Sequence, residues 1–313
     1  MRILVVGAGA VGGYFGGRLV QAGRDVTFLV LPKRAEQIQA QGLQILSPMH
    51  GDFTARPKTI TASQIASPYD VIFLSVKSYS LAAAIDDFAP AVGPQTVIIP
   101  VLNGMHHMDV LTQKFGEHAV LGGVCFVSTA VDSQGRIVQL ADFQSLAYGE
   151  LDGKNTSRIE AVHQEFSGAG FQAAISADIS RDMWQKWVFL ASLGAITCLL
   201  RGNIGEIVAA PGGAELCLSA LRECAAIASA CGYPMPEKFL AEKSAQLTAP
   251  GSKLAASMYR DLTEHARVEA DTILGDLVDR GRKHGLSAPI VQAAFVSLTI
   301  YQQEQARAKA VSR

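Results

Sequence analysis

Residues 3–12 of the chain read ILVVGAGAVG, a short apolar run that passes directly into three closely spaced glycines. Residues 3–6 are typical of a buried strand, and residues 11–21 continue with the pattern of a helix. A Gly-x-Gly-x-x-Gly turn in that setting is the dinucleotide-binding fingerprint, although the bare pattern also occurs in structural turns. The sequence therefore predicts a nucleotide site at the first strand of an α/β domain.

Each glycine of this turn has its own task. Gly7 permits the tight turn, Gly9 lets the backbone approach a pyrophosphate, and Gly12 lets helix and strand pack closely. Backbone N–H groups at the start of the helix then face the anion. We therefore expect a dinucleotide to contact Gly7, Gly9, Ala10, Val11 and Gly12.

Strands and helices alternate through the first half of the chain. Buried strand patterns at residues 26–30, 71–76 and 96–100 alternate with helical patterns at residues 35–41 and 80–88. Repeated strand–crossover–strand units are typical of a parallel, doubly wound sheet. The fold class that follows is α/β, with an N-terminal Rossmann-type sheet.

Shorter strand patterns accompany this sheet. Residues 43–46 and 53–55 have the pattern of two antiparallel strands around a turn. Three further strands, which we expect to lie at the end of the same sheet, cover residues 121–129, 137–140 and 145–148.

The second half of the chain is helical by its apolar period. We expect a dinucleotide-binding domain over residues 1–178 and an all-helical substrate and catalytic domain over residues 179–313. The predicted helices cover residues 181–201, 204–208, 213–230, 236–246, 257–264, 269–284 and 289–309.

Composition excludes several classes of protein. The 313 residues include 27 basic and 28 acidic side chains, so no basic surplus favours nucleic-acid binding. Hydrophobic residues make up 49%, which suits large buried cores and leaves little room for disorder. The helical half has enough apolar residues to form a dimer interface, so a second copy of the chain, in a homodimer, is a candidate partner.

Membrane insertion and disulfide bonding are not expected. The longest apolar run, residues 187–200, is too short to span a bilayer and predicts a buried core helix. The five cysteines form no C-x-x-C pair, which indicates a reducing, cytoplasmic setting with neither disulfides nor a metal site.

The end of the second strand bears on the choice of cofactor. An NAD site usually has an acidic residue there that binds the ribose 2′-hydroxyl. Here Leu31 and Pro32 are followed by Lys33 and Arg34, so NADP is favoured over NAD. The alternative is that both bases are ordinary solvated charges.

Two polar residues follow other strands of the predicted sheet, at the edge where ligands bind. Lys77 comes directly after residues 71–76, where it can contact a cofactor phosphate or simply mark the strand end. Asn103 follows residues 96–100, where its amide can bind the nicotinamide ribose or the substrate; Asn-Gly is also a common turn.

Three residues of the helical half stand out. Lys186 lies between two tryptophans at the head of an apolar helix, where partial desolvation suits a proton donor. A lysine that extends from a core helix to solvent is the alternative. Ser257 and Glu269 can face one cleft from two helix ends, or serve only as a helix cap and a helix-dipole charge.

In combination these motifs resemble the ketopantoate reductase (2-dehydropantoate 2-reductase) family. The resemblance covers nearly the whole chain and implies a Rossmann domain, a helical domain and NADPH-dependent reduction of a 2-oxo acid. It rests on the glycine turn, Val76–Lys77, Asn103–Gly104–Met105, Trp184–Gln185–Lys186, and the segment from Ser257–Met258 to Glu269–Ala270–Asp271.

The resemblance also implies roles for single residues. Lys186 matches the family's catalytic lysine and Glu269 its glutamate at the substrate. Ser257 and Asn103 match substrate-side residues, the latter also near the nicotinamide, and Lys77 matches a cofactor-side lysine. Hydride addition to a ketone generates an alkoxide, and a lysine can stabilise that charge and donate the proton.

The chain departs from the family pattern at three positions. Leu190 and Gly194 stand where two asparagines often follow the catalytic lysine, so substrate-facing amides are missing. Leu31 stands where the family has a cofactor-side arginine, for which Lys33 or Arg34 can substitute.

We therefore expect an NADPH-dependent reductase of a small-molecule 2-oxo acid, with ketopantoate as the leading substrate and pantothenate biosynthesis as its setting. A related D-2-hydroxy acid dehydrogenase acting on a bulky apolar 2-oxo acid is the alternative that the missing amides favour. A non-catalytic NADP(H)-binding module and a dehydrogenase of amines or imines are further alternatives.

Overall fold

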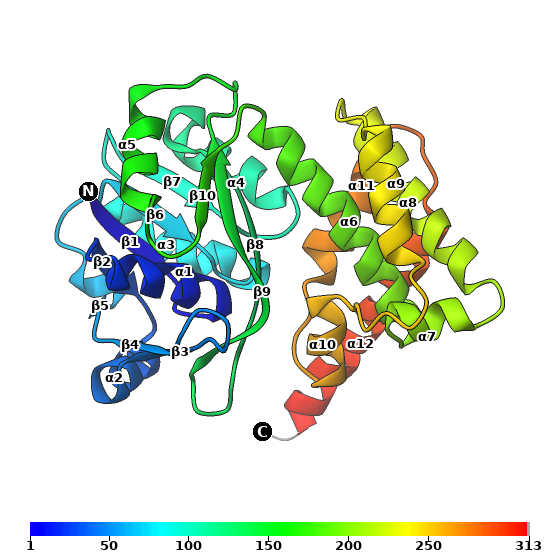
Figure 1. Ribbon diagram of the computed structural model, residues 1–313, viewed down its shortest axis with the longest axis horizontal. Coiled ribbons are helices and arrows are strands. Elements are labelled where there is room, and N and C mark those ends of the chain that lie inside the picture. The colour runs from blue at the N-terminus through cyan, green and yellow to red at the C-terminus, as the bar shows by residue number, and fades with distance from the viewer. Residues whose placement is uncertain (312–313) are drawn as a thin grey trace. The chain divides into compact units, whose positions relative to one another are not determined.

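The structure, a computed structural model, describes residues 1–311. Its contacts divide the chain into two compact units, both drawn in Figure 1. The first unit holds Met1–Leu102 and His107–Asp182. The second holds the chain from Met183 onward together with Asn103–His106, so it includes a short loop from far upstream.

The first unit contains a five-stranded parallel sheet in the order β5-β2-β1-β6-β7, which confirms the doubly wound, Rossmann-type prediction. Val6 at the end of β1 pairs with Leu29 on one side and Leu74 on the other. Helices cover such a sheet, which is why its strands are unbroken apolar runs. The strands are β1 Arg2–Val6, β2 Asp25–Leu29, β5 Lys58–Ile60, β6 Val71–Leu74 and β7 Val97–Pro100.

The helices of this unit pack through aromatic contacts. Phe15 of α1 meets Phe73 of β6 and Phe171 edge-on, with ring centroids 6.1 Å and 4.9 Å apart. The helices are α1 Ala10–Gln21, α2 Pro32–Gln41, α3 Leu81–Phe88, α4 His106–Phe115 and α5 Ser157–Phe166, with short turns η1 Ala62–Gln64, η2 Ser78–Ser80, η3 Ala89–Ala91 and η4 Glu117–Ala119.

A second sheet takes the remaining strands, in the order β10-β9-β3-β4 with β8 paired to β9. The antiparallel pair β3 and β4 is confirmed. The prediction that β8 and β9 extend the first sheet is wrong: they form an antiparallel pair, and β9 also joins β3 and β10. The alternation of apolar residues along a strand indicates which face is buried, but it does not specify which strand pairs with it. The strands are β3 Leu43–Leu46, β4 Phe53–Ala55, β8 Gly122–Val131, β9 Ile137–Gly149 and β10 Gln172–Ile175.

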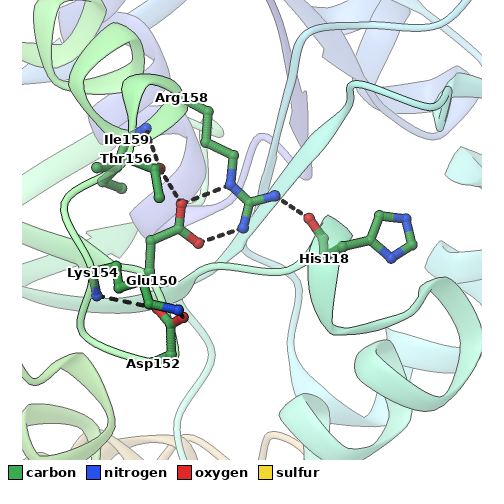
Figure 2. A network of polar contacts seen from close by, with 7 residues as sticks. All are labelled: His118, Glu150, Asp152, Lys154, Thr156, Arg158 and Ile159. Carbon is green, nitrogen blue, oxygen red and sulfur yellow. Dashed lines mark hydrogen bonds and ion pairs between the residues drawn. The ribbon is translucent and has the colours of Figure 1, made fainter.

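A polar network closes the end of β9 against α5 (Figure 2). The carboxylate of Glu150 is 6% exposed and accepts hydrogen bonds from both the Nε and Nη2 groups of Arg158. It also accepts a hydrogen bond from the hydroxyl of Thr156, whose oxygen caps α5 at Ile159. Arg158 in turn donates to the carbonyl of His118. These hydrogen bonds, with those of Arg158 foremost, lower the pKa of Glu150 below its ordinary value of 4.5.

Glu150→Gln is expected to lower the free energy of unfolding by about 2 kcal/mol at neutral pH, less than for a fully buried pair because Arg158 is partly exposed. The folded-state pKa of Glu150 is depressed, so its stabilisation is present above the unfolded pKa and is lost as pH falls through the folded value. Urea unfolding from neutral to acidic pH checks this. A gap between wild type and variant that stays constant into acid would contradict it.

The regular elements of the second unit, within residues 1–311, are all helical. α6 is long and apolar enough to cross a membrane by length and composition, but 67% of its most apolar window is buried in the protein. Val188, Ala191 and Ile196 are fully buried, as in a core helix. The helices are α6 Ile179–Leu200, α7 Ile204–Ala209, α8 Gly213–Ala230, α9 Glu237–Leu247, α10 Ser257–Thr263, the π turn η5 Asp271–Gly275, α11 Asp276–Lys283 and α12 Pro289–Val311.

Candidate active site

The glycine turn lies between β1 and α1, as predicted, and its geometry tolerates no larger side chain at Gly12. A Cβ atom there would lie 2.0 Å from the Oγ of Ser75 and 2.3 Å from the carbonyl oxygen of Gly7. Gly7 has a φ of +96°, a conformation that favours glycine. Nothing lies within 4 Å of a Cβ built on Gly9, so space opens in front of the helix.

The amides of this turn are available to an anion. Gly13 donates the first helical bond to Gly9, at 2.8 Å, so the N–H groups of Ala10, Val11 and Gly12 have no acceptor within α1. No acidic residue occupies the first turn of α1. The open space at Gly9 and these amides fit the pyrophosphate of a dinucleotide.

The start of α2 distinguishes the two candidate bases for the 2′-phosphate. Leu31 is the N-cap residue of α2 and is 73% exposed. Because its side chain is apolar, it offers the cofactor no charge. Lys33 is exposed, whereas Arg34 is half-buried.

Arg34 lies against the glycine turn. Its Nε donates to the carbonyl of Ala8 at 3.3 Å, and its Nη1 donates to Gln37 at 2.6 Å and to the carbonyl of Gly135 at 2.9 Å. All these acceptors are neutral, and Nη2 is buried without a hydrogen-bond partner in the described part of the chain. Burial lowers the pKa of the guanidinium. A phosphate would supply the missing acceptor and counter-charge.

Lys77 belongs to the same edge of the first sheet. It is exposed and caps the short turn η2, just after β6. Since Val6 pairs with Leu74, the glycine turn and the segment leading to Lys77 leave adjacent strands. The glycine turn, the two bases of α2 and Lys77 therefore all follow the carboxyl ends of strands of the first unit, whereas Asn103, which was also predicted to bind the cofactor, groups with the second unit.

Asn103 groups with the helical unit although it follows β7 in sequence. Its neighbour Gly104 has a φ of +84°, and a Cβ there would lie 2.5 Å from the carbonyl oxygen of Thr272 and 3.9 Å from the Nε1 of Trp187. Asn103 itself is half-buried. The sequence places Asn103 at a strand end, and nothing in its local pattern reveals this contact with residues so far along the chain.

Lys186 is half-buried on α6, between Trp184 and Trp187, which are 2% and 1% exposed. The two indoles lie 4.8 Å apart, and Trp187 donates a hydrogen bond from Nε1 to the carbonyl of Ile273 at 2.9 Å. The helix that carries the lysine is therefore tied to the segment that follows Glu269.

Glu269 and Ser257 lie in different surroundings. Glu269 is 8% exposed, and its carbonyl accepts a hydrogen bond from the N–H of Ile273 at 3.1 Å. The helix-cap alternative for Ser257 is wrong, because Ala256 holds the cap position and Ser257 is the exposed first residue of α10. All four predicted catalytic and substrate residues thus belong to the second unit.

The positions of the two missing amides are apolar. Leu190 is half-buried on α6, and Gly194 is buried. A Cβ on Gly194 would lie 2.9 Å from the terminal methyl group of Met258, so that methyl occupies the space a longer side chain would need. A surface hollow of about 550 Å³ elsewhere on this unit, beside α12, is lined by none of the predicted site residues.

The chain matches two family profiles. The profile described as "Ketopantoate reductase PanE/ApbA" covers residues 3–153, and the profile of the C-terminal part of the same family covers residues 178–302.

Relatives and solved structures agree with these matches. The "Uncharacterized oxidoreductase YkpB" of Bacillus subtilis is 35% identical over 97% of this chain and 100% of the relative. A 2-dehydropantoate 2-reductase of Halobacterium salinarum is 28% identical, over 97% and 100% of the two chains. The crystal structure of 2-dehydropantoate 2-reductase from Geobacter metallireducens has a TM-score of 0.86 at 27% identity, covering 96% and 99%. The chain therefore belongs to the ketopantoate reductase PanE/ApbA family of NADPH-dependent oxidoreductases.

Proposed function

We propose that this enzyme reduces 2-dehydropantoate to pantoate, with Lys186 as the proton donor. The observation that supports it most is that the segments bearing Asn103, Lys186 and Glu269 belong to one unit, where the hydrogen bond from Trp187 and the contact at Gly104 join them. A lysine, a carboxylate and an amide on segments that meet in this way suit a 2-oxo acid, whose ketone oxygen becomes an alkoxide.

NADPH supplies the hydride when bound. The ammonium group of Lys186 stabilises the negative charge that develops on the ketone oxygen and then transfers a proton to it, which leaves a 2-hydroxy acid and a neutral amine. Solvent returns the proton to the lysine. Glu269 orients that ammonium group, while Ser257 and Asn103 hold the substrate.

The alternative substrate is a bulky, apolar 2-oxo acid. Leu190, Gly194 and the methyl group of Met258 present carbon where amides would bind the hydroxyl of 2-dehydropantoate. Steady-state NADPH consumption with 2-dehydropantoate and with branched and aromatic 2-oxo acids tests the choice. A kcat/KM for 2-dehydropantoate at least about tenfold above the others supports pantoate formation, and the reverse order supports the alternative.

Arg34→Ala is expected to raise the KM for NADPH about tenfold to a hundredfold, because a charge-assisted contact to the 2′-phosphate is lost. The KM for NADH, which lacks that phosphate, is expected to stay unchanged. Lys33→Ala is the matched control, since Lys33 is exposed and should change neither constant appreciably. Equal losses with both cofactors, or a larger loss in the Lys33 variant, would refute the assignment.

The cysteines support a cytoplasmic setting for this reaction. None of the five cysteines, all of which lie in the described residues, forms a disulfide, and Cys125, Cys198, Cys217 and Cys224 are buried. Burial raises the pKa of the Cys198 and Cys224 thiols to about 12, so these groups stay protonated and act as core residues.

A further inference from the structure

We propose that Trp187 is a positioning residue: its indole N–H holds the π turn η5, and through it Glu269, against the helix that carries Lys186. This inference rests on the proposed function, because it assigns the two ends of the link to a proton donor and its orienting carboxylate. The indole itself takes no part in the chemistry.

The link consists of two hydrogen bonds. Trp187 donates from Nε1 to the carbonyl oxygen of Ile273 at 2.9 Å, and the N–H of Ile273 donates to the carbonyl oxygen of Glu269 at 3.1 Å. Trp187 is 1% exposed and Ile273 is 4% exposed, so water does not compete for either bond. A single residue thus connects the neighbour of Lys186 to the peptide of Glu269.

The acceptor of the indole lies within the π turn η5. Across η5 the N–H of Asp276 donates to the carbonyl of Asp271, five residues back, in place of the usual four. Such turns occur mostly as single-turn irregularities and often at functional sites. Ile273 lies within this turn, and its carbonyl oxygen accepts the hydrogen bond from Trp187, as a carbonyl oxygen can accept two hydrogen bonds.

The loop that carries Asn103 reaches the same point. Gly104 lies so close to the π turn that a Cβ would come within 2.5 Å of the carbonyl oxygen of Thr272 and within 3.9 Å of the Trp187 Nε1. Three separate segments, bearing Asn103, Lys186 and Glu269, therefore meet around one indole N–H.

The indole ring is also fixed in orientation. The guanidinium of Arg280 lies 5.6 Å from the centroid of the Trp187 ring, and its Nε donates to the carboxylate of Asp276 at 3.1 Å. An indole held in this way directs its N–H at one acceptor only.

Trp187→Phe tests the proposal, with Trp184→Phe as the matched control. Both changes replace a buried indole with a smaller ring. The indole of Trp184 stacks on Tyr233, and its N–H makes no hydrogen bond to the described residues. The Trp187 variant should lose kcat by about tenfold to a hundredfold and shift its pH–rate profile, while its Kd for NADPH stays unchanged. The control should keep the wild-type profile. Equal losses that follow the drop in Tm of each variant would overturn the proposal.

Hydrogen exchange separates this inference from the proposed function. The Trp187 variant should exchange faster over residues 269–275 and 103–106, whereas the control should not, and neither result depends on turnover. In the wild-type protein the Trp187 indole N–H should exchange far more slowly than the Trp184 indole N–H. This comparison does not depend on whether a variant folds. Fast exchange at the Trp187 indole would refute the link even in an active reductase. An inactive wild type with a slow Trp187 indole would refute the reductase instead.

Discussion

Lys186→Met is expected to lower kcat for 2-oxo acid reduction by about a thousandfold and to leave the Kd for NADPH unchanged. Methionine keeps much of the length and packing of the lysine, but it offers the developing alkoxide neither a charge nor a proton. Lys186 lies on the helical unit, whereas the glycine turn and Arg34 lie on the first, so cofactor binding should survive. Steady-state rates and a fluorescence titration with NADPH measure the two quantities separately.

Lys253→Met is the control for this variant, because Lys253 is an exposed lysine outside the proposed site on the same unit. It should behave as wild type in both measurements. Turnover that survives in the Lys186 variant would show that another group protonates the product. A wild type that binds NADPH but reduces no 2-oxo acid would instead favour the non-catalytic binding module.

Gly12→Ala is expected to weaken NADPH binding by more than about a hundredfold and to lower the Tm of the protein without cofactor. The added methyl group would lie 2.0 Å from Ser75 Oγ and 2.3 Å from the carbonyl of Gly7, so α1 must move away from the sheet. Movement of α1 carries the amides of Ala10 and Val11 out of position. Thermal unfolding and NADPH titration together measure the effect.

Gly9→Ala provides the comparison within the same turn. Nothing lies within 4 Å of the position of its methyl group, so the Tm without cofactor should stay close to wild type. The methyl group then enters only the space that a pyrophosphate would take, and NADPH binding should weaken. A Gly12 variant with wild-type Tm and wild-type affinity would contradict the packing account of this turn.

Local pattern was sufficient to predict the helical half and four strands of the first sheet, β1, β2, β6 and β7, but not the short edge strand β5. The glycine spacing after Val6 specified the turn, because close packing and positive φ leave few other residues possible there. The core helix at residues 187–200 followed from its apolar run, and α6 is largely buried. These features depend on residues within one or two turns of each other, which a single sequence records directly.

Long-range pairing and contacts were not predictable in the same way. The partner of β8 is β9 within a separate sheet, and no alternation of side chains specifies that choice. The contacts of Trp187 with Ile273 and of Gly104 with Thr272 join segments far apart along the chain. Nothing in the sequence favoured either Lys33 or Arg34 as the residue that binds the 2′-phosphate. The structure distinguishes them, because Lys33 is exposed, whereas Arg34 donates a hydrogen bond to Ala8 in the glycine turn.

The most direct test of the central claim is the fate of the transferred hydrogen. Purified protein is given 2-dehydropantoate and NADPH that is deuterated at the transferred position of the nicotinamide, and the product is examined by mass spectrometry. The proposed reaction predicts a 2-hydroxy acid with one deuterium on the carbon that carried the ketone, and no such product from the Lys186→Met variant in the same time. Formation of no deuterated 2-hydroxy acid from 2-dehydropantoate or from any apolar 2-oxo acid would contradict the account.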